Sequence, residues 1–530
     1  MSRRAAGVST RLGLAVTSGV PVLVLVSMGS VAALTGTVSP AIWAVSALIG
    51  FFMAIAFADL GASLPHVTGG IGACAGAVLA RRSRTLAVTA RWSYWFGWSP
   101  ALAINSALVG SYVHDTLVPR APAWTVVLIA VLVLGGSVTV NHYGVRYGAR
   151  LQVALIACVA VPVALVAGTA LVRGDFQPGR LAPFAPPGGW LSGHGLVAVA
   201  GGLFLAGWSA YGAELALAYG TEYRRGIRDA VRTLMVIAVV SVAVYSLLPL
   251  ILTGVLGTAR IQADPAIALR PLAEQVAGGF AGLIVGVLVL ALLLGTNMIM
   301  IASSRTLYQL ARDGNAWRFL GAVNRHGVPA NALRFDFGVN TLLLVAVFAL
   351  NHGQTSDVPL ALLAASNVGY ILSVSLALIA AWLNHRQASG SSRSLRIRPG
   401  LMRVGLALAV FNLALLLTAG FAWGWANLLL GAAVLTGLIA AFARGFRRAP
   451  AESGLSQPPV CIAWSAASRV HSASQLQLTS TGGERYPWPV TAKFGHRRVP
   501  TWSSNNSPSV NSRFSATSRP GRGTGRSPTT

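Results

Sequence analysis

Two short runs of small and polar residues interrupt apolar segments of this chain, and their composition suits the binding of a zwitterion. The first run is Ser27-Met28-Gly29-Ser30, and the second is Gly207-Trp208-Ser209-Ala210-Tyr211-Gly212. Inside a membrane, backbone that leaves the helical conformation is tolerated only where it lines a cavity or contacts a bound group. Half-helix N-termini attract an anion there, and freed carbonyls accept from an ammonium group. An amino acid carries both groups, although small residues that only let two helices pack closely give the same pattern.

Acidic and aromatic side chains near these runs are candidates for coupling and gating. Glu214 lies inside an apolar segment, where an unpaired charge costs about 2.5–3.5 kcal/mol, so we expect it to be neutral or paired. Two roles are open for Glu214: it couples transport to protons, or it is a structural carboxylic acid held by hydrogen bonds. We expect Asp59 and Glu222, nearer the ends of apolar segments, to form gate or loop ion pairs. Trp208 is expected to stack on a substrate or to close over it.

Several further side chains have two interpretations each. Asn105 and Asn297 suit a cavity lining, and a hydrogen bond between helices explains each of them equally well. Four Trp and Tyr residues follow Arg91, and we interpret most of them as anchors at a membrane interface. They are Trp92, Tyr94, Trp95 and Trp98.

The sequence contains no pattern typical of an enzyme, a metal site or a cofactor site. The three cysteines, Cys74, Cys158 and Cys461, have no CxxC spacing, and the nine histidines form no HxxxH pair. HExxH, GxSxG and paired intramembrane aspartates are absent from the sequence. The only lysine, Lys493, has no phosphate-binding loop before it, which excludes an ATP-driven motor within this chain. We therefore predict no catalytic residue, no metal and no cofactor.

The elements that must position these residues are membrane helices. Of the 530 residues 54% are apolar and only 10% are charged, with a mean hydropathy of +0.64. A soluble protein carries about 25% charged residues. The net charge of +27 comes from arginines between apolar runs, so it indicates a membrane protein rather than a nucleic-acid partner.

A bilayer core requires about 20 apolar residues per helix, and the chain has about twelve such runs. They lie near 12–34, 38–60, 92–113, 123–140, 151–172, 195–220, 233–257, 278–303, 335–351, 358–383, 401–420 and 422–443. The predicted organisation is a cytoplasmic arm over 1–11, a transmembrane domain over 12–445 and a basic, disordered tail over 446–530.

The distribution of arginine supports this count and sets an orientation. If the N-terminus is cytoplasmic, the cytoplasmic segments hold 23 arginines and the opposite loops hold five. Because cytoplasmic loops are rich in Lys and Arg, both termini are predicted to lie on the cytoplasmic side of the inner membrane.

The two interrupted runs lie in the first and sixth predicted spans, five spans apart. An odd repeat length inverts the second copy in the membrane, which is the plan of secondary transporters. We therefore predict alternating-access transport of an amino acid or related amine, with a proton favoured over sodium as the coupling ion and exchange also open. The alternative is a channel or solute sensor that uses the same spans without coupling.

Several motifs, in matching order over about residues 15–445, resemble the amino acid–polyamine–organocation superfamily, and amino-acid permeases within it. The strongest is SRTLYQLARDG over 304–314, followed by Val328-Pro329. The others are Tyr211-Gly212-Ala213-Glu214 with Glu222, Asn141-His142-Tyr143-Gly144, and Ala58-Asp59-Leu60 with Gly69-Gly70.

The resemblance implies a leucine-transporter-type fold. In that fold, spans 1–5 and 6–10 are inverted repeats, spans 1 and 6 are broken, and spans 11 and 12 are appended. The substrate is expected between spans 1, 3, 6, 8 and 10. The sequence departs from the family pattern at Asp59, where Glu is usual, and at Met28-Gly29-Ser30, which stands in place of G-[ST]-G. Of that last motif, only Gly29 is matched to a position of the family pattern.

Overall fold

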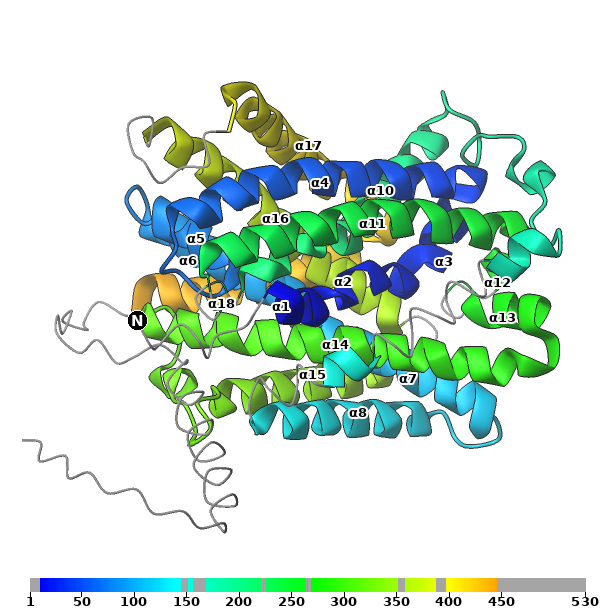
Figure 1. Cartoon of the computed structure of the whole chain (residues 1–530), viewed down its shortest axis with the longest axis horizontal. Helices are drawn as coiled ribbons and strands as arrows, with labels where there is room; N and C mark the ends of the chain where they lie inside the picture. The colour runs from blue at the N-terminus through cyan, green and yellow to red at the C-terminus, as the bar shows by residue number, and fades with distance from the viewer. Residues whose placement is uncertain are drawn as a thin grey trace, which may run out of the picture. The chain divides into compact units, whose positions relative to one another are not determined.

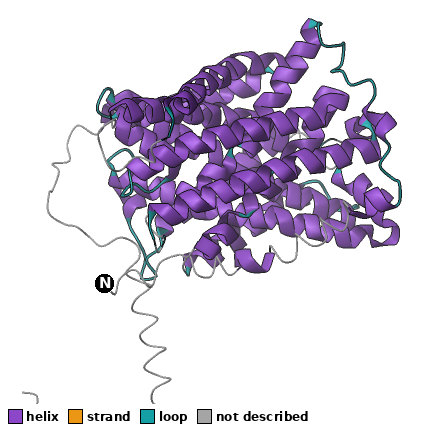
Figure 2. Cartoon of the chain, turned by 45° about the horizontal axis from the view of Figure 1, so that its top comes forward, coloured by secondary structure: helices purple, strands orange, loops and turns teal. Residues whose placement is uncertain are grey.

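The computed structural model describes residues 10–143, 151–155, 168–218, 220, 223, 225–263, 265, 268–350, 358–387 and 397–445. The predicted tail, most of the predicted arm and Glu222 lie outside these residues. The described part is built from helices and connecting loops, and Figure 2 draws no strand in it.

The first part of the chain forms a series of helices up to residue 142, separated by short connections. They are α1 (Thr10–Thr17), α2 (Gly19–Val22), α3 (Val24–Thr35), the 3-10 helix η2 (Gly36–Val38), α4 (Ser39–Ser63), α5 (Gly70–Leu79), α6 (Arg84–Trp98), α7 (Ala101–Leu117) and α8 (Trp124–His142).

The second part contains the longest helices, including α14 with 32 residues. Its elements begin with η3 (Pro178–Leu181), α10 (Gly193–Ala210), η4 (Gly212–Leu217), α11 (Ile227–Leu256), α12 (Thr258–Ala263), α13 (Leu269–Ala277) and η6 (Gly278–Phe280). They continue with α14 (Ala281–Arg312), η7 (Arg318–Gly321), α15 (Ala330–Leu350), α16 (Val358–Gln387), α17 (Pro399–Trp423) and α18 (Trp425–Gly445).

Within the described residues, nine segments are long and apolar enough to cross a membrane, so the chain is a multi-pass membrane protein. The count of about twelve spans stays a prediction, as does the inverted repeat. Predicted spans 1 and 2 run together in one segment, Gly19–Ser63. Predicted span 3 is divided between α6 and α7, and most of predicted span 5 lies outside the described residues.

Burial separates inner helices from outer ones. About three quarters of the apolar window is buried in the segments Gly193–Leu217 and Pro359–Gln387, against 28% in Trp124–His142 and 22% in Trp425–Phe442. The inner segments correspond to α10 with η4, and to α16. Helix α4 lies alongside α11 (Figure 1), and α16 packs against both α6 and α17.

The structure corrects the position of the first predicted interruption. Residues Ser27, Met28, Gly29 and Ser30 lie inside the regular helix α3 and are buried. The helix is interrupted earlier, at Ser18 and Leu23, on either side of the four-residue helix α2. Pro21 lies in α2 and cannot donate a backbone hydrogen bond. The expected position rested on Gly and Ser as helix breakers, whereas proline disfavours a helix more strongly than either.

The second interruption falls at one end of the predicted run. Gly207, Trp208, Ser209 and Ala210 continue α10, and the helix changes after Tyr211 into the 3-10 helix η4. A 3-10 turn has a tighter backbone than an α-helix, so side chains after Tyr211 point in new directions. One of these side chains is Glu214.

A third interruption, which the sequence analysis did not predict, divides span 3. Helix α6 ends at Trp98 and α7 begins at Ala101, with Ser99 and Pro100 between them. Proline removes a helical hydrogen bond and its ring clashes with the preceding turn. Pro100 therefore accounts for the division.

Candidate functional site

A buried carboxylate lies where α10 changes into η4. Glu214 is fully buried, and its two oxygens accept three hydrogen bonds. Tyr94 Oη donates to Oε2 at 2.8 Å, Trp98 Nε1 donates to Oε1 at 3.0 Å, and Tyr370 Oη donates to Oε1 at 3.3 Å. The donors come from α6 and α16, so this carboxylate joins three inner segments of the bundle.

Aromatic rings surround this carboxylate. The ring centroid of Trp98 lies 5.3 Å from that of Trp208 and 4.9 Å from that of Tyr370. Trp208 Nε1 donates to the carbonyl oxygen of Gly97 at 3.0 Å, which fixes the indole against α6. At Gly212, a Cβ would lie 3.1 Å from the Trp98 ring, so a residue without a side chain allows this close approach.

The interrupted part of span 1 meets the end of α10. Ser209 Oγ donates to the carbonyl oxygen of Leu23 at 3.1 Å. Tyr245 Oη donates to the carbonyl oxygen of Ser209 at 2.9 Å and also to that of Val20. Carbonyls at the ends of α2 therefore accept from side chains of α10 and α11. The interruption of span 1 thus contacts α10 through Leu23 and α11 through Val20, and Gly29 takes no part in these contacts.

The structure places Gly29 against backbone instead of open space. A Cβ at Gly29 would lie 2.1 Å from the carbonyl oxygen of Pro265 and 3.0 Å from Cβ of Ala268. Ser27 is buried on the same helix, and its Oγ has no hydrogen-bond partner. Helix α3 thus offers one free buried hydroxyl, while its glycine packs against the segment that follows α12.

Asn297 takes part in a chain of buried amides that links several helices. Its Nδ2 donates to Gln152 Oε1 at 2.8 Å, and its Oδ1 accepts from Asn141 Nδ2 at 2.8 Å. Gln152 Nε2 in turn donates to the carbonyl oxygens of Val16 and Leu294, each at 3.2 Å. Of the two interpretations of Asn297, the structure shows the interhelical hydrogen bond.

Asn105 differs from Asn297 in its surroundings. It is buried in α7, and neither Nδ2 nor Oδ1 has a hydrogen-bond partner. A Cβ at Gly295 of α14 would lie 2.9 Å from Asn105 Nδ2 and 3.5 Å from Leu23 Cδ2. A free amide, with one donor group and one acceptor, therefore lies beside the interrupted part of span 1. Most buried polar groups are paired, so this exception requires an explanation.

Of the two acidic residues predicted as gate partners, the structure describes Asp59. Asp59, near the end of α4, has its Oδ2 3.3 Å from His385 Nδ1 near the end of α16. In the same region Asn384 Nδ2 donates to Ser63 Oγ at 2.8 Å. Glu222 lies outside the described residues.

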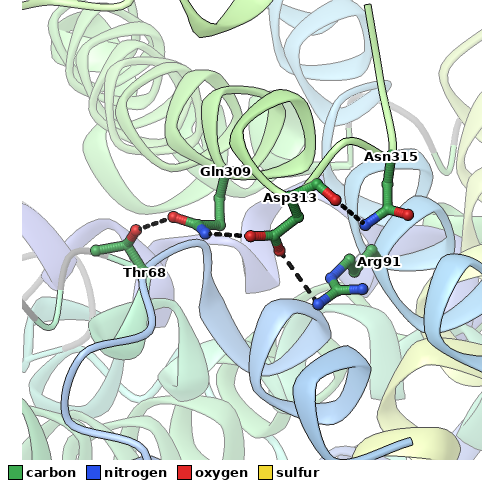
Figure 3. A network of polar contacts seen from close by, with 5 residues as sticks. All are labelled: Thr68, Arg91, Gln309, Asp313 and Asn315. Carbon is green, nitrogen blue, oxygen red and sulfur yellow. Dashed lines mark hydrogen bonds and ion pairs between the residues drawn. The ribbon is translucent and has the colours of Figure 1, made fainter. Parts of the chain in front are cut away.

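A polar network closes the end of α14, as Figure 3 shows. Arg91 Nη2 lies 3.1 Å from Asp313 Oδ2, and Gln309 Nε2 donates to Asp313 Oδ1 at 2.7 Å. Thr68 Oγ1 donates to Gln309 Oε1 at 2.6 Å, and Asn315 Nδ2 donates to the carbonyl oxygen of Asp313 at 3.2 Å. Burial raises the pKa of the Asp313 carboxyl, and the charge of Arg91 acts against this shift.

The interpretation of the span-3 aromatics as interfacial anchors is wrong. Trp92, Tyr94, Trp95 and Trp98 are all buried and all donate hydrogen bonds within the protein. Tyr94 and Trp98 donate to Glu214, and Trp95 donates to Asp336. The acidic partners lie more than 100 residues away in the sequence, so their positions could not be inferred locally.

Interrupted helices packed around a buried carboxylate, in a chain with several apolar spans, place this molecule among multi-pass membrane proteins of the transporter type. The family described as amino acid permease matches residues 12–447. The chain therefore belongs to the amino acid permease family. This confirms the resemblance stated from the motifs, and it makes the protein a member of a transporter family rather than an enzyme.

Individual relatives are similar over part of the chain. The lysine-specific permease LysP of Escherichia coli is 28% identical over 46% of this chain and 51% of its own length. The amino-acid permease RocE of Bacillus subtilis is 25% identical over 62% of this chain and 71% of its own length. The uncharacterized transporter Rv1999c of Mycobacterium tuberculosis is 30% identical over 54% of this chain and 62% of its own length. The matched part thus spans about half the length of LysP.

Proposed function

We propose that this protein is a secondary active transporter that moves amino acids or related amines across the cell membrane by alternating access. The observation that carries the proposal is the contact between two interrupted helices, in which Ser209 of α10 donates to the carbonyl oxygen of Leu23. The buried Glu214 follows five residues after Ser209. Interrupted helices that face each other within a bundle form the binding region of many transporters.

We place the substrate beside the interrupted part of span 1, between α3, α7 and the Gly207–Tyr211 end of α10. Ser27 Oγ and the amide of Asn105 are buried there without partners, so they are available to a carboxylate and an ammonium group. Trp208 supplies an aromatic face. The backbone that binds the substrate then includes Leu23, because Gly29 packs against Pro265.

The substrate class follows from the relatives and from the chemistry of this region. The relatives include a lysine-specific permease and a gamma-aminobutyric acid permease, both of Escherichia coli, and each of these substrates carries an amine. A carboxylate such as Glu214 suits a positive group or a proton. We therefore propose an amino acid or amine as substrate and coupling through Glu214, with a proton favoured over sodium and exchange as the other mode.

Uptake by purified protein in liposomes tests this function. An amino-acid panel is offered with an imposed proton gradient, an imposed sodium gradient or a substrate-loaded interior. We expect saturable uptake of at least one amino acid or amine, driven by the proton gradient or by internal substrate. Steady electrical conductance without coupled uptake would identify a channel instead.

The variant Glu214→Gln tests the coupling role. It retains an oxygen that accepts hydrogen bonds and removes the protonation site, so proton-driven uptake should fall roughly tenfold or more while exchange continues. Glu274→Gln is the matched control, because Glu274 is exposed on α13 and pairs with Arg270. Equal proton-driven uptake by the two variants would remove Glu214 from the mechanism.

A further inference from the structure

A second carboxylate is buried on the outer helix α15. Asp336 is fully buried, and its Oδ1 accepts three hydrogen bonds. Trp95 Nε1 donates at 3.0 Å, Ser99 Oγ at 2.8 Å and Ser303 Oγ at 3.0 Å. The donors come from α6, from the Ser99–Pro100 interruption and from α14, so three separate segments converge on one oxygen atom.

Asn340, one helical turn after Asp336, completes this arrangement. Its Nδ2 donates to Ser99 Oγ at 3.1 Å and to the carbonyl oxygen of Asp336 at 2.8 Å. Its Oδ1 accepts from the backbone nitrogen of Ala103 at 3.3 Å. Because Ser99 receives a hydrogen bond from Asn340, its own hydroxyl hydrogen is directed to Asp336. The network thus orients its donors toward Oδ1.

The other carboxylate oxygen, Oδ2 of Asp336, is buried and has no hydrogen-bond partner. Five arginines lie on the helices that supply the network. Arg84 is the first residue of α6 and Arg312 the last of α14, and the other three interact elsewhere. Arg91 pairs with Asp313 at 3.1 Å, Arg305 Nη1 donates to the carbonyl oxygen of Ile301 at 2.8 Å, and Arg334 Nη1 donates to Asn331 Oδ1 at 3.3 Å.

Charged or titratable groups on the other elements packed against α15 are also engaged elsewhere or lie toward helix ends. Tyr370 of α16 donates to Glu214. The groups toward the ends of α7, α8, α16 and η7 are His114, Asp115, His142, His385, Arg386 and Arg318. Among the described residues, no ion pair with Asp336 is formed.

Asp336 and Glu214 use neighbouring faces of one helix. Tyr94 and Trp98, four residues apart, donate to Glu214, while Trp95 and Ser99, also four apart, donate to Asp336. Residues four apart share a helix face, and successive residues differ by about 100° around the axis. Helix α6 and the interruption that follows it therefore lie between two buried carboxylates.

We propose that Asp336 is a second proton-binding site, separate from Glu214. A charged carboxylate within a span is costly without a cation, while three donors stabilise its anion. These opposing effects let the group take up a proton on Oδ2, converting the carboxylate to a neutral carboxylic acid, and release that proton to water. The donors direct hydrogens rather than lone pairs at Oδ1, an arrangement unsuited to a metal cation, which requires oxygen lone pairs.

The role of this site in a transport cycle rests on the proposed function, but proton binding can be measured without transport. We suggest infrared difference spectra of the full chain in liposomes, recorded between low and high pH in H₂O and D₂O. We expect acidification to produce a carboxylic C=O band that is missing in Asp336→Asn and retained in Glu274→Gln. Glu214→Gln should retain it as well.

Two further variants keep the proposal testable if Asp336→Asn does not fold. Asp336→Glu keeps a carboxyl group and Ser303→Ala removes one donor to it, so each should shift the frequency of the band without deleting it. Identical spectra for wild type and Asp336→Asn would overturn the proposal, as would a band that neither of these two variants moves. Suppression of the band by sodium, but not choline, at constant pH would assign the site to a metal cation and also overturn it.

Absence of transport together with an Asp336-dependent band would refute the proposed function and leave this site standing. Transport without an Asp336-dependent band would support the proposed function and overturn the proton-binding site at Asp336. The two proposals are therefore tested by separate measurements on one preparation.

Discussion

Side chains of α6 and α7 carry most of the polar chemistry at the centre of this protein. Tyr94 and Trp98 hold one acid, and Trp95 holds another. Asn105, further along the same predicted span, has a free amide. Buried donors without a partner are costly, so a ligand that pairs with Asn105 would gain free energy from that contact. Under the proposed function, we expect substrate binding to depend on Asn105.

Asn105→Ala should weaken substrate binding without weakening the fold. Because the amide forms no hydrogen bond in this structure, its removal costs little stability, whereas a lost pair of substrate contacts raises KM by roughly tenfold. KM for uptake and the thermal midpoint of the purified protein measure the two effects. Asn412→Ala is the matched control, since Asn412 Nδ2 donates to the carbonyl oxygen of Leu408 in the outer helix α17. A similar KM change in both variants would contradict the assignment.

Gly29→Leu should abolish uptake while the protein still reaches the membrane. The added Cβ would lie 2.1 Å from the carbonyl oxygen of Pro265, so the segment after α12 must move away from α3. Uptake per amount of membrane-inserted protein is the measurement. Gly136→Leu is the control, because a Cβ at Gly136 of α8 meets no atom within 4 Å. Normal transport by Gly29→Leu would show that the contact between α3 and Pro265 is dispensable.

Among the elements, helix α14 links two polar networks, the one around Asp336 and the one around Asp313. Ser303 donates to Asp336, and about two to three turns later Gln309 and Asp313 form the network of Figure 3. That network ties the end of α14 to Arg91 at the beginning of the buried part of α6 and to Thr68 in the loop after α4. A movement of α14 against α6 must therefore break the contact between Arg91 and Asp313.

Arg91→Leu should destabilise the protein more than the double variant Arg91→Leu/Asp313→Asn. Removing one partner of a mostly buried ion pair leaves an uncompensated charge, which costs about 3 kcal/mol when fully buried and about 2 kcal/mol here, since Asp313 is partly exposed. The double variant removes that charge and should recover part of the loss. Thermal unfolding of the four proteins of this double-mutant cycle gives the coupling energy. Additive effects would show that the ion pair contributes nothing.

For the whole molecule, the segregation of arginine predicts which surfaces face the cytoplasm. Arg228→Cys, at the beginning of α11, should react with a membrane-impermeant thiol reagent only in inverted vesicles. Leu191→Cys, at a fully exposed position before α10, should react only from the outside. Both are made in a chain whose own three cysteines are replaced. Labelling of Arg228→Cys in intact cells would reverse the orientation that we propose.

The amino-acid sequence determined the membrane setting, the approximate positions of the helices and the family. These properties follow from local composition, because about 20 consecutive apolar residues are enough to span a bilayer core wherever they occur. The motif over 304–314 is also local, and the family match over residues 12–447 confirms what it indicated. Gly207–Gly212 likewise pointed to the place where α10 gives way to η4.

Tertiary structure alone decided how the polar residues combine. The sequence placed the first interruption at Ser27–Ser30, but the structure places it at Ser18 and Leu23. There Ser209 donates to the carbonyl oxygen of Leu23, and Tyr245 donates to that of Val20. The sequence indicated that Trp95 is an anchor at a membrane interface, but its indole N–H donates to Asp336, 241 residues later. The local sequence around a tryptophan is the same whether its indole N–H faces a membrane interface or donates to a buried acid. Only the partner that packs against it determines which role it has, and that partner is fixed by the packing of distant helices.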